Sequence, residues 1–354
     1  MQKLSLPINS DVFGILTSYI QNESITDVDY NGSELWVTTT DNVRYQVECA
    51  KQQIEKGFLE KFTSIIANEV SCHFNAAETV LEAETETLRI TMIHESVAVT
   101  GRSFCIRKSL PALRFSVGDA ISNSYASREV LAFLINCVAA KMNFVFCGEP
   151  AAGKTECAKF LSQFIPVNEK VITIEDNPEL HYKKINPNND AVEIKVNRRM
   201  DYTKAIKTSL RMNPSWLMLS EVRSTEARAL LTCWSTGIKG FTTLHTDSVK
   251  KIPERLLNMM ENDTESQRII NDIYSYVDVG VLLCKKMFPD GEIRRYIDQI
   301  CLYTRSQNQN RLFMLVDQGK LLTNTLPEEI SLKMNQKGIT DYFANPAAKE
   351  DSDG

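Results

Sequence analysis

The segment from Gly148 to Thr155 constrains this chain more than any other feature of its sequence. Its eight residues, GEPAAGKT, fit the pattern G-x-x-x-x-G-K-[ST]. A short apolar run, NFVFC, precedes them, and the spacing of apolar residues in ECAKFLSQF after them predicts a helix. A strand, a glycine-rich loop and a helix N-terminus in this order form a cradle whose backbone N–H groups bind phosphate. The sequence therefore predicts a phosphate site in an α/β domain.

The residue types in this segment also indicate what it would bind. The pattern places Lys154 where it would reach the β and γ phosphates of a nucleotide, and Thr155 where it would ligate Mg²⁺. We therefore expect ATP and Mg²⁺ as the cofactors. The predicted cofactor-binding residues are Gly148, Glu149, Pro150, Ala151, Ala152, Gly153, Lys154, Thr155 and Glu156.

Polar side chains follow three other apolar runs. VITIED ends in Glu175 and Asp176, WLMLSE ends in Glu221, and GFTTLHT carries His245. In parallel sheets ligands gather at the carboxyl ends of the strands, so these groups are expected at the same edge as Lys154. Phosphoryl transfer to water needs a carboxylate to manage Mg²⁺ and the attacking water. A loop acid can also merely cap the next helix, and a single histidine is often structural, so both alternatives stay open.

The first third of the chain has the pattern of a small α+β domain. Residues 24–49 alternate apolar and polar side chains around turn signals at Asn31-Gly32 and Asp41-Asn42, which predicts strand–turn–strand pairing. Residues 52–70 have apolar positions at three- and four-residue spacing, which predicts a helix. Residues 87–109 are typical of further strands, and the pairing in this part is expected to be antiparallel.

From about residue 121 the pattern changes to buried strands alternating with helices. The strand candidates are NFVFCG, KVITIED, SWLMLSEV and GFTTLHT, and helical patterns include residues 201–213 and 224–236. Such alternation implies an α/β domain with a mostly parallel sheet. The sequence therefore predicts an α+β domain over residues 1–109, a linker over 110–120, a nucleotide-binding domain over 121–335 and a polar, disordered tail over 336–354.

Composition limits the class of partner and the compartment. The chain has 354 residues, 43% of them hydrophobic, and a net charge of −5, so nothing in its charge favours direct contact with nucleic acid. Its nine cysteines show no C-x-x-C pair, which fits reduced thiols in a cytosol. The N-terminus lacks the pattern of a signal peptide, and the longest mostly apolar segment, VLAFLINCVAA, is too short to span a bilayer. We expect a cytoplasmic protein.

Four stretches taken together resemble the type II/type IV secretion ATPases, the traffic ATPases of secretion, conjugation and pilus systems. GEPAAGKTE, VITIEDNPELHY, SLRMNPSWLMLSEVRSTEA and STGIKGFTTLHTDS look like the Walker A, Asp, Walker B and His boxes of that family, in the same order. The resemblance covers roughly residues 20–305 and is most specific over 143–250. It implies a PAS-like N-terminal domain joined to a RecA-like P-loop ATPase domain, assembled as a hexameric ring.

The resemblance also implies roles for strand-end residues. Glu221 in the Walker B box would be the general base or water-orienting acid, and Glu175 in the Asp box would help position water or metal. His245 would contact the γ-phosphate. The implied metal site is therefore Thr155, Glu175 and Glu221.

Five arginines complete the implied site. Arg211 and Arg223 flank the Walker B box, where the family keeps basic residues for ring contacts or phosphate sensing. The N-terminal domain of the family supplies arginines that reach a nucleotide at a domain or subunit boundary. Arg89 and Arg107 are the best matches, with Arg102 behind them, and each could instead be a solvated arginine at a strand edge.

The sequence departs from the family pattern in several places. Ile238 stands where many relatives carry a second histidine, and Ser220 replaces a small glycine that commonly precedes the Walker B glutamate. Neither change removes a required charge. The zinc-binding tetracysteine insertion and the long N-terminal extension of some members are absent, and this layout favours the conjugation/type IV secretion or Tad-pilus-like branch.

The resemblance implies a homo-hexameric motor that hydrolyses ATP for a type IV secretion, conjugation or pilus-assembly machine. It would act through membrane-embedded platform proteins and associate peripherally with the inner face of the cell membrane. An ATP-binding scaffold that does not hydrolyse is the alternative. A RecA-like motor on DNA is weaker because no basic stripe or DNA-binding module is evident, and a small-molecule kinase lacks a substrate lid motif.

Overall fold

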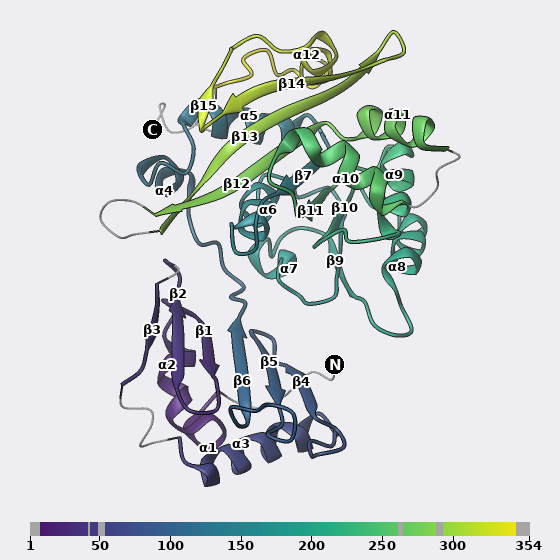
Figure 1. Cartoon of the computed structure of the whole chain (residues 1–354). Helices are drawn as coiled ribbons and strands as arrows, with labels where there is room; N and C mark the ends of the chain where they lie inside the picture. Colours follow the sequence, from purple (N-terminus) through teal and green to yellow (C-terminus); the bar gives the residue numbers. More distant parts are fainter. Residues whose placement is uncertain (1–7, 42, 49–53, 261–264, 288–292, 345–354) are drawn as a thin grey trace. The chain divides into compact units, whose positions relative to one another are not determined.

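The structure is a computed structural model that describes residues 8–41, 43–48, 54–260, 265–287 and 293–344. The chain divides near residue 110 into two compact units (Figure 1). Both units combine helices with strands, so the predicted mixed α/β class is confirmed. Among the described residues, no helix has the length and apolar character needed to cross a membrane.

The first unit is built on a six-stranded sheet in the order β3-β2-β1-β6-β5-β4, in which neighbouring strands pair antiparallel. The Asn31 side chain closes the first predicted turn, because its Oδ1 accepts hydrogen bonds from the backbone N–H groups of Ser33 and Glu34. The second predicted turn involves Asn42, which lies outside the described residues. The strands are β1 (Ile25–Tyr30), β2 (Leu35–Thr39), β3 (Arg44–Gln46), β4 (Val80–Glu84), β5 (Leu88–Ile93) and β6 (Ser103–Lys108).

The helix predicted over 52–70 is α3, which spans Lys56–Glu69; residues 52 and 53 lie outside the described residues. Its apolar face packs on the sheet, with the ring of Phe62 5.6 Å from the rings of both Phe13 and Phe104. Phe13 comes from a short N-terminal helical segment. That segment consists of α1 (Ser10–Phe13), η1 (Gly14–Leu16) and α2 (Thr17–Gln21).

The second unit contains the region in which strands and helices alternate along the chain. β9, β8 and β10 pair in parallel, and so do β11, β7 and β12. A bridge between Trp216 and Lys239 joins the start of β10 to the chain entering β11. The bounds are β7 (Phe144–Cys147), β8 (Val171–Glu175), β9 (Ala191–Lys195), β10 (Trp216–Leu219), β11 (Phe241–Leu244) and β12 (Val279–Met287).

Three further strands extend the sheet beyond β12, in the order β13-β14-β15. They pair antiparallel with one another and span Ile293–Ser306, Gln309–Asp317 and Lys320–Leu321. The sequence pattern indicated none of these strands. The second unit therefore has a three-stranded parallel sheet, β10-β8-β9, and a six-stranded sheet. The six-stranded sheet is parallel over β11, β7 and β12 and antiparallel over β13, β14 and β15 (Figure 1).

Helices cover both faces of the layer that the two sheets form, joined by the bridge between Trp216 and Lys239. Side chains alternate between two separate hydrophobic clusters, so that Trp216 and Met218 enter one and Leu217 and Leu219 the other. Strands that are buried on both faces explain the continuous apolar runs in the sequence. Helices α5 (Arg128–Ala139), α6 (Lys154–Ser162) and α12 (Glu328–Asn335) contribute to the first cluster. Helices α8 (Tyr202–Ser209), α9 (Glu226–Ser235), α10 (Ile252–Met259) and α11 (Ser266–Tyr276) contribute to the second.

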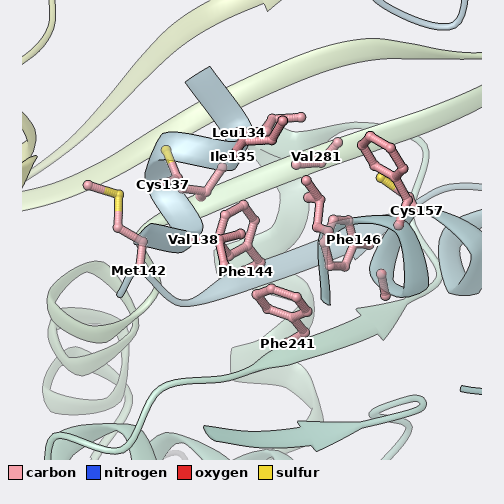
Figure 2. Close-up of a cluster of buried hydrophobic side chains, with 14 of the residues drawn as sticks. Leu134, Ile135, Cys137, Val138, Met142, Phe144, Phe146, Cys157, Phe241 and Val281 are labelled. Atoms are coloured by element: carbon pink, nitrogen blue, oxygen red, sulfur yellow. The ribbon is translucent and has the colours of Figure 1, made fainter. Parts of the chain in front are cut away.

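Aromatic side chains fill the space beneath the strand that leads to the glycine-rich loop. Figure 2 shows Phe144 and Phe146 of β7 beside Phe241 of β11, with Val138 of α5 close to them. Both β7 rings meet the Phe241 ring edge-on, at centroid distances of 4.9 and 5.7 Å. Edge-to-face packing of this kind adds to the energy of burial and fixes the rings in place. The strand before the loop is thus held by a rigid core.

Two predicted segments contain ordered structure over part of their length. The predicted linker, residues 110–120, contains the start of helix α4 (Val117–Ser122), which a capping box between Ser116 and Asp119 initiates. The predicted disordered tail is ordered over residues 336–344. There the Asn136 side-chain amide donates to the carbonyls of residues 341, 342 and 344, and Phe343 stacks on Phe133 at 5.5 Å. The remainder of that predicted tail, residues 345–354, lies outside the described residues.

We expect Asn143→Ala to destabilise the second unit by about 3 kcal/mol, because two buried backbone groups would lose their partners. Asn143 is 1% exposed; its Nδ2 donates to the Tyr276 carbonyl at 2.7 Å, and its Oδ1 accepts from Gly240 N–H at 3.0 Å. Urea unfolding followed by circular dichroism would measure the change. The control is Asn258→Ala on the exposed face of α10. Equal stability of the two variants would contradict this role of Asn143.

Candidate phosphate-binding site

The glycine-rich loop begins directly after β7 and ends at the N-terminus of α6. Gly148 has φ +143°, and a Cβ there would lie 2.3 Å from the Leu283 carbonyl oxygen. Gly153 has φ +93° and caps α6 in the left-handed conformation. Both motif glycines therefore occupy backbone positions that other residues adopt only with strain. Arg295 Nε donates to the Ala151 carbonyl at 3.0 Å and supports the middle of the loop.

The Lys154 ammonium group is buried inside this loop, with the residue only 8% exposed. Its Nζ donates to the carbonyls of Gly148 and Glu149 at 2.9 and 3.0 Å and lies 3.2 Å from His245 Nδ1. Among the described residues, no carboxylate forms an ion pair with it, and burial lowers the pKa of Lys154. A buried cation surrounded by neutral acceptors is a favourable site for an anion.

The Glu179 carboxylate contacts the predicted Mg²⁺ ligand, Thr155. Thr155 Oγ1 donates to Glu179 Oε2 at 3.4 Å, a long contact. Glu179 belongs to the loop after β8, in the stretch IEDNPEL. The sequence does not single out Glu179, because three acids occur within five residues and their spacing does not say which one faces Thr155. The structure brings Glu179 to the loop.

Glu175, the last residue of β8, holds this same loop in place. It is 3% exposed, and its Oε2 accepts hydrogen bonds from the backbone N–H groups of Glu179 and Leu180 at 2.9 and 3.0 Å. Burial raises the pKa of Glu175 to about 8. These contacts make Glu175 the internal support of the loop that carries Glu179.

Glu221 follows β10, and its carboxylate contacts His245 and Arg223. Its Oε1 lies 3.2 Å from His245 Nε2, and its Oε2 accepts from Arg223 at 2.7 Å. Arg223 also contacts Asp176 Oδ2 at 3.2 Å, and Glu221 beside it raises the pKa of the guanidinium. The structure therefore brings Glu221, His245 and Arg223 together at one edge of the sheet, as the strand order predicts.

His245 joins Lys154 to Glu221. Lys154 has three N–H donors, and Gly148 O, Glu149 O and His245 Nδ1 are within reach of them. His245 Nδ1 also lies 3.2 Å from the Gly148 carbonyl, to which it could donate only if it carried a proton. Because Nε2 lies 3.2 Å from the Glu221 carboxylate, the neutral ring has its proton on Nε2, and Nδ1 accepts from Lys154. We assign this tautomer from the partners. The result is a continuous polar chain from the buried ammonium to the strand-end carboxylate.

Other predicted site residues lie elsewhere in the second unit. Arg211 belongs to η3 (Leu210–Met212), which precedes the start of β10, whereas Glu221 follows its end. Glu156 pairs with Lys159 at 3.1 Å and with Arg114 at 3.6 Å. Arg211 lines a surface groove with Asp201, Thr203, Lys204, Lys207 and Thr208.

The predicted arginines of the first unit lie on neighbouring strands. Arg89 of β5 and Arg107 of β6 are register partners, and Arg107 Nε donates to Asp27 at 2.8 Å. Arg102, which precedes β6, donates twice to Glu95, at 2.6 and 2.8 Å. It also donates to Thr63 at 2.9 Å. Arg102 thus has a structural partner set of its own.

The residues present fit Mg²⁺ bound together with a phosphate. In the described part of the chain, no cluster of three or more His, Cys, Asp or Glu side chains could hold a metal by itself. Mg²⁺ in nucleotide sites usually takes only one or two protein ligands and completes its shell with phosphate and water. The Thr155 hydroxyl and the Glu179 carboxylate supply oxygen donors of this kind.

Comparison with known families identifies the class of protein. The sequence model of the family described as "Type II/IV secretion system protein" matches residues 78–342. The chain belongs to this family. The match extends across most of the second unit and into the first, beyond the four boxes on which the resemblance rests.

Individual relatives are more distant. An uncharacterised protein of Bacillus anthracis is 25% identical over 334 residues, which are 91% of this chain and 75% of that protein. The type IV secretion system protein VirB11 of Brucella suis is 32% identical over 165 residues, 43% of this chain and 45% of VirB11. The chain thus matches less than half the length of that VirB11.

Solved structures show the same fold. The Legionella pneumophila ATPase DotB superposes with a TM-score of 0.63 at 16% identity, covering 92% of this chain and 87% of DotB. The pilus retraction motor PilT, solved with bound ADP, gives a TM-score of 0.60 at 13% identity, covering 92% of this chain and 86% of PilT. At these identities the likeness establishes the fold.

Glu175→Gln tests the buried carboxyl through pH. An ordinary glutamate titrates near 4.5 and folded Glu175 at about 8, so between these values the folded state binds the extra proton and stability falls as pH rises. The variant keeps the acceptor oxygen but cannot ionise. From about pH 5 to about pH 8.5, it should gain at least about 1 kcal/mol in unfolding free energy relative to wild type.

Urea unfolding of both proteins at the two pH values measures this difference. Glu254→Gln, on the exposed face of α10, serves as the matched control and should show no such gain. A constant difference between wild type and Glu175→Gln across the pH range would show that Glu175 titrates normally.

Proposed function

We propose that this protein is an ATPase that hydrolyses ATP to ADP and phosphate and powers a type IV secretion, conjugation or pilus-assembly machine. The observation that carries the proposal is the polar chain from Lys154 through His245 to Glu221. It links the anion site in the loop to a carboxylate on another strand. Binding alone would need the loop, whereas hydrolysis also needs the carboxylate.

The residues at this edge divide the work of phosphoryl transfer. Lys154 and the backbone N–H groups at the start of α6 bind the β and γ phosphates. Glu221 accepts the proton of the attacking water, and His245 contacts the γ-phosphate and reports its loss to Glu221. Mg²⁺ would neutralise charge that builds up between the β and γ phosphates.

The position of Glu179 changes the assignment of the second acid. We propose that Glu179, with Thr155, supplies the protein side of the Mg²⁺ site, because its carboxylate reaches the Thr155 hydroxyl. Glu175 then acts indirectly, because it accepts hydrogen bonds from two backbone N–H groups of the loop that carries Glu179. This replaces the earlier expectation that Glu175 itself meets metal or water.

The remaining roles concern assembly. We propose a homo-hexamer in which a RecA-like ATPase domain follows a PAS-like N-terminal domain. Arg89 and Arg107 are proposed to reach a nucleotide at a domain or subunit boundary, where a guanidinium would stabilise transition-state charge. Arg223 is proposed to sense phosphate through its bond to Glu221. Arg211 lines the surface groove beside α8, and we propose that it contacts a neighbouring subunit of the ring.

Family membership supports the cellular setting that we propose. Relatives include a conjugal transfer protein TrbB of Rhizobium radiobacter and a competence protein ComGA of Streptococcus pneumoniae, beside VirB11 proteins. We propose a cytoplasmic motor at the inner face of the cell membrane that acts through membrane-embedded platform proteins. An ATP-binding scaffold that does not hydrolyse ATP would need the loop but would not use Glu221.

Turnover measured across a concentration series tests the motor directly. Mg²⁺-dependent ATP hydrolysis per chain should rise steeply with protein concentration if neighbouring subunits complete the site, and it should vanish in Lys154→Ala. Glu221→Gln should bind ATP but lower turnover roughly 100-fold or more, because the proton acceptor is lost. Wild-type turnover no higher than that of Lys154→Ala, with ATP still bound, would favour the scaffold.

A Mg²⁺ titration separates the two acids of the β8 loop. We expect Glu179→Gln to raise the Mg²⁺ concentration for half-maximal turnover by about ten-fold, because it removes a charged oxygen donor from the site. Glu129→Gln, an exposed acid in the first turn of α5, is the control and should leave the titration unchanged. An unshifted Glu179→Gln titration would remove Glu179 from the metal site.

A further inference from the structure

We propose that Tyr202 is a positioning residue for Glu221 and that it acts through the side chain of Ser220. This inference rests on the proposed hydrolytic function. Ser220 stands directly before Glu221, at the position where the sequence departs from the glycine common in the resembled family. A glycine there offers no hydroxyl, so the contact described below depends on this departure.

Tyr202 is the first residue of α8, and its phenolic oxygen lies between two strand ends. The Asp176 backbone N–H, just after β8, donates to it at 3.0 Å. Ser220 Oγ, just after β10, lies 3.2 Å from it. β8 and β10 are parallel neighbours, so this single oxygen ties the loop after one strand to the loop after the next.

The chemistry of a phenol suits both contacts at once. One lone pair accepts from Asp176 N–H, which leaves the hydroxyl hydrogen and a second lone pair for Ser220 Oγ. Burial raises the pKa of Tyr202 to about 12. The phenol therefore keeps its proton throughout the range in which an ATPase would be assayed.

The backbone on either side of Glu221 is fixed by other bonds. The Ser220 carbonyl accepts from Thr243 Oγ1 at 2.7 Å, and Val222 N–H donates to the Thr243 carbonyl at 2.9 Å. The Ser220 N–H also donates to the Ile174 carbonyl of β8 at 3.2 Å. The Tyr202 contact adds a side-chain hydrogen bond to this turn from the side of β8. It sets the angle at which Glu221 leaves the strand end toward His245.

A second tie between the same strand ends is weaker. Arg223 contacts Asp176 and Glu221, but its side chain is 60% exposed. Exposed ion pairs contribute little, because solvent screens them and long side chains lose entropy. The Tyr202 contact is partly buried, and it is therefore the one that can hold Glu221 to the fraction of an ångström that proton transfer requires.

This placement predicts a specific kinetic signature. Among the described residues, Tyr202 has no hydrogen bond to the segment from Gly148 to Thr155, so its loss should leave nucleotide binding intact. Misplacing Glu221 should slow the chemical step instead. The effect therefore falls on kcat and leaves KM unchanged, which a general loosening of the fold would not produce.

The test compares Tyr202→Phe, Ser220→Ala and the double variant in ATP turnover at saturating protein concentration. Each single variant should lower kcat roughly ten-fold at unchanged KM and unchanged affinity for a fluorescent ADP analogue. The double variant should be no slower than Tyr202→Phe, because Ser220→Ala removes a contact that Tyr202→Phe has already removed. Tyr342→Phe, which loses a hydroxyl bonded to Asn335 near the C-terminus, is the matched control and should turn over like wild type.

The outcomes separate this inference from the function on which it rests. Wild-type turnover at the Lys154→Ala level removes the hydrolytic function and the inference with it. Normal wild-type turnover with unchanged kcat in Tyr202→Phe, or with additive losses in the double variant, overturns the inference alone. A rise in KM at constant kcat also overturns it, because the contact would then serve nucleotide binding.

Discussion

The burial of one ammonium group sets the arrangement of this edge of the sheet. Lys154 is held under the loop by the carbonyls of Gly148 and Glu149, which requires the tight backbone that the two motif glycines provide. A cation in that position needs either nearby negative charge or an anionic ligand. Glu221, which contacts Lys154 through His245, supplies negative charge at a distance. The loop has the shape to bind an anionic ligand.

Much of this could be predicted from the sequence because the relevant signals are local. A strand buried on both faces is a continuous apolar run, and NFVFCG, KVITIED, SWLMLSEV and GFTTLHT became β7, β8, β10 and β11. Parallel strands bring their carboxyl ends to one edge, so the meeting of Glu221 with His245 followed from topology alone. The helical patterns predicted after the glycine-rich loop and over residues 201–213 and 224–236 became α6, α8 and α9.

The sequence could not settle contacts that depend on loop paths. Whether Glu175 or Glu179 faces Thr155 is decided by a turn in which one acid accepts the backbone N–H of the other. Arg211 was grouped with Arg223 because both flank one motif, yet a whole strand separates them. The segment 336–344 looked polar, but Phe343 and three backbone carbonyls find partners on α5, some two hundred residues away in the chain.

The docking of that segment on α5 has a consequence for how the protein can be shortened. Asn136 is 1% exposed, and its amide nitrogen satisfies its hydrogen bonds only with carbonyls of the last described residues. A chain ended after α12 would expose the Phe133 ring and leave a polar group stranded in an apolar helix. Helix α5 and β7 share one hydrophobic cluster, so the segment 336–344 helps to support the strand that leads into the phosphate loop.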